Sequence, residues 1–191
     1  MRLLHIDSSA LGANSATREI TAALVAQVRA ARPDATVVRR DLDAAPLPHL
    51  DGAILGGVNA KAAEQSAQVL EEFLAADTVV IGAPMYNFAI PSSLKAWIDR
   101  IAVAGKTFRY TQDGPEGLVR GKTVIVAVAA GGVHAGQPTD FVEPYLRQVF
   151  GFIGVTDLRF VRAEGVALST DHRRNAIEAA IDGARALPKA A

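Results

Sequence analysis

The chain has 191 residues, of which 50% are apolar, and its 20 basic residues balance its 20 acidic ones. This length is enough for one domain with a full core, so we expect a single domain over residues 1–191. A formal charge of zero lacks the basic surface of a nucleic-acid-binding protein and the polybasic patch of a membrane-surface protein. The absence of cysteine excludes thiol nucleophiles, thiolate metal sites and disulfide relays, so any redox chemistry requires a cofactor. No apolar run reaches the ~18 residues of a membrane span and no signal-peptide pattern is present, so we expect a soluble, cytoplasmic protein.

Strand-like and helix-like segments alternate along the chain. The strand-like runs are Leu3–Ile6, Thr36–Val38, Thr78–Ala83, Thr123–Ala129 and Leu158–Val161. The segments with helical periodicity are Ser15–Ala31, Ala60–Ala76, Pro91–Ala104, Thr139–Phe152 and Thr170–Leu187. This alternation predicts an α/β fold, a three-layer α/β/α sandwich with a five-stranded parallel sheet in the order 2-1-3-4-5.

Two irregular segments interrupt the alternation. Residues Ala44–Asn59 contain proline and glycine and are expected to pack over an edge of the sheet. Residues 105–122, GKTFRYTQDGPEGLVRGK, carry Phe108 and Tyr110 two positions apart, which predicts a hairpin with a turn at Asp113–Pro115.

The first strand is followed by a hydroxyl-rich loop, residues 8–18, that ends where a helix begins. The first turn of a helix leaves N–H groups unpaired at the positive end of its dipole, and these bind an anion with little formal charge. Ser9, Ser15 and Thr17 add three hydroxyl groups. The simpler alternative is that Asn14 or Ser15 only caps the helix. The loop matches neither a P-loop nor the G-x-G-x-x-G of a dinucleotide fold, which favours a mononucleotide such as FMN.

The most informative segment is APMYNFAIP, residues 83–91, which passes from a buried strand into a proline-started helix. Pro84 has no N–H group and is expected to end the strand pairing. The next four residues, MYNF, are therefore expected at the carboxyl end of a strand, where ligands bind in open α/β sheets.

The fourth strand ends in AAGGVH, residues 129–134, and its glycine pair lets a ligand approach the backbone closely. In the predicted strand order, the loops after strands one, three and four lie together at the topological switch point. Backbone groups there can bond the polar edge of an isoalloxazine ring, and N–H groups near N1 and O2 would stabilise its reduced form. Each loop alone is equally compatible with ordinary packing or a plain turn, but three such loops at the right strand ends favour a flavin site.

No side chain is placed as a catalytic acid, base or metal ligand. His134 on its loop can either contact a substrate or lie in solvent, and His5 inside the first strand is structural. Asp7, Asp99 and Asp140 lie near the ends of elements without forming a carboxylate pair. We therefore assign no catalytic residue and no metal site.

Several motifs together give the chain a family resemblance over nearly its whole length. They are the SS…S-x-T loop, APMYNFAIP, the 105–122 insert, GGVHAGQPTDFVEPYLRQVFGFIG and RAEGVA. With these motifs the chain resembles the FMN-dependent NADH-azoreductases, flavodoxin-like homodimeric enzymes related to the quinone reductases. The resemblance implies a flavodoxin-like FMN-binding domain and a homodimer acting on small aromatic acceptors.

The resemblance also implies which residues form the site. FMN contacts are implied at Ser9, Ser15, Ala16, Thr17, Met85, Tyr86, Asn87, Phe88, Ala129, Ala130, Gly131 and Gly132. A substrate cavity shared with a second subunit is implied at Phe88, Phe108, Tyr110, His134 and Phe152. Two features depart from the family pattern. Ala129 and Ala130 replace a Ser-Arg pair, so only backbone contacts are expected there, and the Asp51–Gln68 stretch is shorter.

The implied reaction is a two-step hydride transfer with ping-pong kinetics. NADH or NADPH reduces FMN and leaves, and then a quinone or an aromatic azo compound is reduced, the azo compound being cleaved to amines in two cycles. Two alternatives remain at this stage. A one-electron flavodoxin-type carrier is disfavoured by the zero net charge, and a flavin-free hydrolase or phosphatase is disfavoured by the missing nucleophile.

Overall fold

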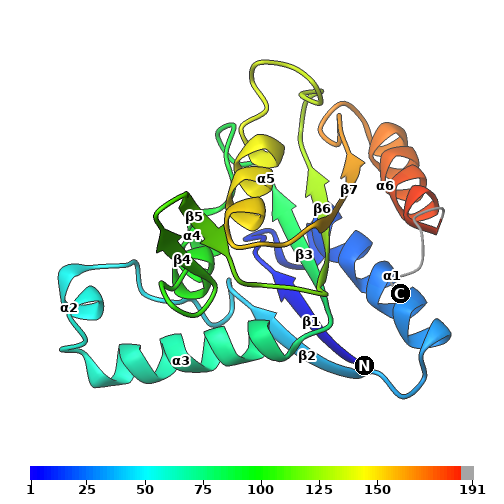
Figure 1. Cartoon of the computed structure of the whole chain (residues 1–191). Helices are drawn as coiled ribbons and strands as arrows, with labels where there is room; N and C mark the ends of the chain where they lie inside the picture. Colours follow the sequence, from blue (N-terminus) through cyan, green and yellow to red (C-terminus); the bar gives the residue numbers. More distant parts are fainter. Residues whose placement is uncertain (186–191) are drawn as a thin grey trace.

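The centre of the molecule is a five-stranded parallel sheet, seen in a computed structural model that describes residues 1–185 (Figure 1). Its order is β2-β1-β3-β6-β7. The strands are β1 (Arg2–Asp7), β2 (Thr36–Asp41), β3 (Thr78–Pro84), β6 (Thr123–Ala129) and β7 (Asp157–Ala163). The predicted parallel sheet is therefore present, and the last two strands of its predicted order carry the numbers 6 and 7. The numbers differ because β4 (Phe108–Thr111) and β5 (Gly114–Gly117) form a separate antiparallel hairpin.

Helices cover both faces of the sheet, as the alternation of elements predicts (Figure 1). The helices are α1 (Ala16–Ala31), α2 (Gly52–Leu55), α3 (Ala60–Ala75), α4 (Ser92–Ile101), α5 (Val142–Phe152) and α6 (Thr170–Arg185), with a 3-10 turn η1 at Gly12–Asn14. Helices α1 and α6 bury one apolar cluster against the sheet, and α3, α4 and α5 bury the other. Among these described helices, none combines the length and apolar character needed to cross a membrane.

Several predicted boundaries differ from the observed ones, and hydrogen bonds account for two of the differences. Helix α4 ends at Ile101 rather than Ala104, because the hydroxyl of Thr107 bonds the Ile101 carbonyl and the Val103 N–H, closing a turn. Helix α5 begins at Val142 rather than Thr139, because an oxygen of Asp140 accepts the N–H groups of Val142 and Glu143. The predicted end of the last helix at Leu187 lies outside the described residues.

Strand β3 ends at the proline of APMYNFAIP, but Pro84 itself belongs to the strand, which therefore extends one residue beyond the expected Ala83. Pro84 is the last residue of β3 and pairs with Ala129 of β6. The next residue, Met85, donates its N–H to the carbonyl of Ala129 at 2.8 Å. A proline is tolerated here because the ladder bond is supplied by the N–H of the residue that follows it.

The two irregular segments also differ in detail from their predictions. The hairpin β4–β5 is present, but Gly114 and Pro115 belong to β5, so its turn lies at Gln112 and Asp113. The Ala44–Asn59 segment contains the short helix α2, which the sequence does not predict. Asp51 starts this helix by accepting the N–H of Ile54.

Candidate active site

Hydrogen bonds join the three loops that follow β1, β3 and β6. The hydroxyl of Tyr86 lies 3.0 Å from that of Ser9 and accepts the N–H of Ala10 at 3.2 Å. The bond from Met85 to Ala129 joins the second loop to the end of β6. The structure therefore brings the three predicted loops together at the carboxyl edge of the sheet (Figure 1).

The start of helix α1 offers unpaired donors next to hydroxyl groups. Ser15 caps the helix, accepting the N–H of Arg18 at 3.3 Å, and its hydroxyl lies 3.1 Å from that of Thr17. Within residues 1–185, the N–H groups of Ala16 and Thr17 donate to no acceptor, as expected for the first turn of a helix. Gly82 lets this helix lie close to β3, since a side chain there would meet Thr17 at 3.3 Å. The capping role of Ser15 and an anion site at the same turn are thus compatible.

Arg18, in the first turn of α1, forms an ion pair with the carboxylate of Asp41. The guanidinium of Arg18 bonds the carbonyl of Ser9 at 2.9 Å and both oxygens of Asp41, one of them at 2.7 Å. The Arg18 hydrogen bond is the main cause that lowers the pKa of Asp41 to about 2. Arg18 thus fixes the loop after β1 while its charge is balanced. A second arginine, Arg173, bonds the Asn14 carbonyl of this loop and is likewise paired, with Glu19, so the unpaired donors at the loop are N–H dipoles.

Asp7, at the end of β1, is a buried carboxylate beneath the same loop. Its oxygens accept hydrogen bonds from Thr21 at 2.9 Å and Arg39 at 2.7 Å, and Nε2 of His5 lies 3.2 Å away. Burial acts to raise the pKa of Asp7, but the neighbouring His5 and the hydrogen bonds from Arg39 and Thr21 outweigh burial and lower it. His5 therefore lies buried beside Asp7, which supports the structural role expected for it.

The MYNF segment forms a strained two-residue turn. Tyr86 and Ala89 exchange backbone hydrogen bonds of 2.9 and 3.0 Å, and the residues between them, Asn87 and Phe88, have φ of 49° and 70°. Among the described residues these are the only non-glycine positions with positive φ. Two successive positive φ values make a type I′ turn, which aromatic residues rarely adopt. Such strain concentrates at functional sites and holds the Phe88 ring out at the carboxyl edge, where it is 51% exposed.

The carbonyl groups of Gly131 and Gly132, the glycine pair after β6, accept hydrogen bonds, whereas their N–H groups are unpaired in the described part of the chain. The loop after β7 donates to the carbonyls of Ala130, Gly131 and Gly132 at 3.1, 3.2 and 2.8 Å. Ala130 also donates its N–H to the carbonyl of Ala163. In the described part of the chain, the N–H groups of Gly131 and Gly132 have no acceptor. At the glycine pair, two N–H donors are therefore left for a ligand.

His134 lies against Phe88 rather than free in solvent. The two rings meet edge to face with centroids 5.8 Å apart, and Nδ1 of His134 lies 2.9 Å from the hydroxyl of Thr139. Its backbone N–H is bonded to Glu164. His134 thus packs against the loop that follows β3.

A second aromatic group lies on the hairpin. The ring of Phe108 contacts that of Phe152 at 4.6 Å and meets Tyr110 edge-on at 5.6 Å. In residues 1–185 no ring contact joins this group to Phe88 and His134. Within one chain, the residues expected to line the substrate cavity therefore form two separate groups.

Two glycines hold the hairpin against the end of α5. A side chain at Gly117 would place its Cβ 2.2 Å from the nitrogen of Gly154, and Val119 donates to the carbonyl of Ile153 at 2.9 Å. Gly154 itself has φ of 99°. Sequence reasoning missed this contact, although both glycines lie inside motifs that carry the family resemblance.

Exposed apolar side chains collect at the same edge of the sheet. The loops after β1, β3, β6 and β7 carry apolar side chains that are at least half exposed, namely Leu11, Phe88, Val133, Phe141 and Leu168, and the segment after β2 carries two more, Leu55 and Val58. Tyr110 on the hairpin is 75% exposed. Such a gathering of apolar surface is typical of a binding site or a protein interface.

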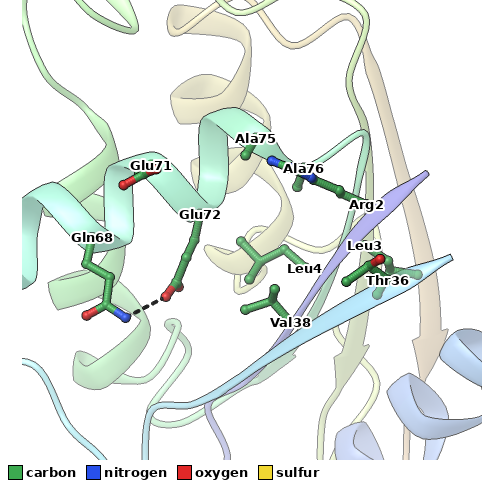
Figure 2. A pocket seen from close by; sticks show the side chains of 10 residues that line it. All are labelled: Arg2, Leu3, Leu4, Thr36, Val38, Gln68, Glu71, Glu72, Ala75 and Ala76. Atoms are coloured by element: carbon green, nitrogen blue, oxygen red, sulfur yellow. Dashed lines mark hydrogen bonds between the residues drawn. The ribbon is translucent and has the colours of Figure 1, made fainter.

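A cavity of about 370 Å³ lies elsewhere, between α3 and the amino ends of β1 and β2 (Figure 2). It is lined by Arg2, Leu3, Leu4, Thr36, Val38, Gln68, Glu71, Glu72, Ala75 and Ala76. Figure 2 shows the amide of Gln68 bonded to Glu72, which is also held by Arg40. This cavity is at the opposite edge of the sheet from the three loops. Across residues 1–185 no group of three histidine or acidic side chains is placed to hold a metal ion.

Comparison with known proteins agrees with this arrangement. The chain is 59% identical to FMN-dependent NADH:quinone oxidoreductase 1 of Xanthomonas axonopodis pv. citri (strain 306), covering 96% of this chain and 95% of that protein. It is similar to the crystal structure of azoreductase from Bacillus anthracis str. Sterne, with a TM-score of 0.88, 30% identity and 96% coverage of each chain. It is also similar to an FMN-dependent NADH-azoreductase from Bacillus anthracis str. Ames Ancestor in complex with FMN, with a TM-score of 0.86, 26% identity and coverage of 98% and 99%. The family described by its flavodoxin-like fold matches residues 1–187, and the chain belongs to this family.

Proposed function

We propose that this chain is an FMN-dependent NADH:quinone oxidoreductase that also cleaves aromatic azo compounds to amines. The observation that carries the proposal is the junction of three donor-rich loops at the ends of β1, β3 and β6. Unpaired N–H groups lie at both ends of this junction, at the first turn of α1 and at the glycine pair after β6. The names of the Xanthomonas and Bacillus relatives support the same activity.

The residues present fit FMN without any further charged group. Ser9 and Ser15–Thr17 would bind the phosphate through hydroxyl and N–H groups. Met85–Phe88 would lie along the ring, and Gly131 and Gly132 would donate N–H groups to its polar edge.

Ala129 and Ala130 would contribute apolar contact only. The carbonyl of Ala129 accepts from Met85, and both polar backbone groups of Ala130 are bonded to the loop that ends β7. These three backbone groups thus already have hydrogen-bond partners inside the protein.

Bound FMN would take a hydride from NADH and pass it to an acceptor in a second half-reaction. The chain would orient the reactants, because no catalytic acid or base is assigned among the described residues 1–185. The walls around a planar acceptor would be formed by five ring side chains, Phe88, Phe108, Tyr110, His134 and Phe152. Each aromatic ring contact would contribute about 0.5–1.5 kcal/mol to binding beyond the burial of apolar area.

We further propose that the enzyme is a homodimer and that residues 1–191 act as one FMN-binding domain. The exposed apolar loops and Tyr110 make a poor solvent surface but a suitable interface centre. A second copy would bring the hairpin aromatics of one subunit to the Phe88 of the other. The cytoplasmic location expected from the sequence remains a prediction.

The visible spectrum of the purified protein tests the cofactor, and steady-state kinetics test the reaction. We expect a flavin spectrum, NADH oxidation with quinones and azo dyes, and parallel double-reciprocal lines. A protein that binds no added FMN, or that oxidises no NADH with any quinone, would refute the proposal.

Sedimentation velocity tests the dimer separately. We expect the mass of two chains at assay concentrations. A fully active species with the mass of one chain would exclude a shared site while leaving the FMN assignment intact.

A further inference from the structure

The segment RAEGVA, residues 162–167, belongs to the motifs that carry the family resemblance, yet nothing in the proposed reaction uses it. It follows β7 directly and runs beside the glycine loop after β6. The N–H groups of Gly165, Val166 and Ala167 donate to the carbonyls of Gly132, Ala130 and Gly131. Three successive carbonyls of one loop are therefore bound by three successive N–H groups of the other.

These three bonds fix the direction of the free donors. In a trans peptide, the C=O of one residue and the N–H of the next point in opposite directions. Cis peptide bonds are absent from the described residues. Because the carbonyls of Ala130 and Gly131 face the β7 loop, the N–H groups of Gly131 and Gly132 face away from it.

The carboxylate of Glu164 adds two further hydrogen bonds between the loop after β7 and the loop after β6. Its Oε1 accepts the N–H groups of His134 at 3.1 Å and Ala135 at 2.9 Å. The same oxygen lies 3.2 Å from a guanidinium nitrogen of Arg162, and the Glu164 side chain is only 14% exposed. One carboxylate oxygen thus holds the far end of the glycine loop, including the residue whose ring contacts Phe88.

Arg162 connects this carboxylate to the start of helix α5. Its guanidinium bonds Asp140, which caps α5, and Glu143 at 2.6 Å. A partly buried charge network therefore ties β7, the glycine loop and α5 together. Hydrogen bonds to charged groups contribute about twice as much as neutral ones, so the network is suited to fixing a loop.

We infer that Glu164 is a positioning residue of the flavin site: together with the three backbone bonds it clamps the loop after β6, so that the Gly131 and Gly132 N–H groups face the flavin edge and His134 faces Phe88. The inference rests on the proposed function, because it concerns how the same site would tune FMN. Donors held at the polar edge of the ring favour its reduced form. Loosening the clamp should therefore weaken the binding of reduced FMN more than that of oxidised FMN.

The test compares Glu164→Ala and Glu164→Gln with the control Asp157→Asn. Asp157 begins β7, the strand that Glu164 follows, and pairs with Arg159 two residues away, as Glu164 pairs with Arg162, but at the opposite end of the sheet. Glutamine keeps an oxygen that can accept the N–H groups of His134 and Ala135. Glu164→Gln should therefore retain most of the slow exchange, FMN affinity and potential that Glu164→Ala loses. Three measurements are needed: amide hydrogen exchange in the flavin-free protein, affinity for FMN, and the two-electron potential of bound FMN.

In Glu164→Ala we expect at least tenfold faster exchange at His134 and Ala135. We also expect reduced FMN to lose about tenfold more affinity than oxidised FMN, which lowers the potential by about 30 mV. Asp157→Asn should match the parent in all three measurements. If Glu164 only stabilised the fold, Glu164→Ala would unfold more easily but the potential of its bound FMN would not change. That result would overturn the inference.

The hydrogen-exchange measurement separates this inference from the proposed function. If the parent protein bound no FMN, the proposed function would fail, and the tuning role with it. Exchange at His134 and Ala135 would still report whether the clamp exists. Unchanged exchange in Glu164→Ala, with FMN bound normally, would refute the clamp alone.

Discussion

The contact between the hairpin and the end of α5 can be tested with one methyl group, by the substitution Gly117→Ala. The added Cβ would lie 2.2 Å from the nitrogen of Gly154 and 2.5 Å from its Cα, whereas ordinary contacts begin at 3.4 Å. All the nearest atoms are backbone, so no side chain can rotate away. The hairpin must therefore retreat by about 1 Å.

The cost of this retreat can be worked out from the contacts it affects. Overpacking a tight contact costs about 1–3 kcal/mol, and the 2.9 Å bond from Val119 to Ile153 would be weakened at a further cost of about 1 kcal/mol. A loss of about 3 kcal/mol lowers Tm by roughly 6–12 °C in a protein of this size. The same movement would shift Phe108 away from Phe152, so kcat/KM should change more for bulky acceptors than for small quinones.

Gly151→Ala is a matched control, because it adds the same methyl group two residues before Ile153. Nothing lies within 4 Å of a Cβ at Gly151, and its φ is not positive. Alanine there should stabilise helix α5 by up to about 1 kcal/mol. Urea unfolding of both flavin-free variants measures the difference. If Gly117→Ala unfolded within 1 kcal/mol of the parent and kept its acceptor preference, the close approach would not constrain the hairpin.

Three further changes test other parts of the site. Replacing Ser15 and Thr17 together by Leu should weaken FMN binding at least tenfold while the protein stays folded, and equal flavin retention would contradict the phosphate assignment. Phe152→Ala should alter the ratio of kcat/KM between azo dyes and quinones by more than about twofold, with little effect on flavin reduction by NADH in stopped-flow measurements. Because the pKa of Asp41 is lowered to about 2 from 3.8, mainly by the hydrogen bond from Arg18, the contacts of this carboxylate stabilise the fold above pH 4 by at most about 2 kcal/mol. That contribution should be lost as the pH falls from 4 to 2, and acid titrations of Arg18→Met should retain only the smaller part that the N–H groups of Asp43 and Ala44 supply.

Much of the fold could be predicted because it rests on local patterns. The apolar β-branched run Thr123–Ala129 gives the observed bounds of β6, and the start of α3 follows from a capping residue, Asn59. The end of α4 could not be predicted, because the hydroxyl of Thr107 that closes the following turn acts six residues beyond Ile101. Helix α2 has only four residues, too few to produce a periodic pattern.

The position of the site could be predicted from the sequence, but the ion pairs and hydrogen bonds that hold its loops in place could not. Strand ends place the loops, so Ser9, Tyr86 and the glycine pair were expected to be neighbours. Arg18 forms its ion pair with Asp41, 23 residues away, and Glu164 bonds the N–H of His134, 30 residues away. No local sequence pattern reveals partners at such separations. The positive φ of Phe88 was also unpredictable, since such values are rare in aromatic residues.

The balanced charge of Arg18 determines how the first turn of α1 would distinguish among anions. A pocket of arginines attracts any anion from a distance, and salt weakens that attraction beyond a Debye length of about 8 Å. Here the guanidinium is held by Asp41 and by the Ser9 carbonyl, so the donors left are short-range dipoles. Their attraction begins only at contact and depends on the shape of the group that enters. FMN binding should therefore change little with ionic strength, and free sulfate or phosphate should compete poorly with a ligand that also fills the ring end of the site.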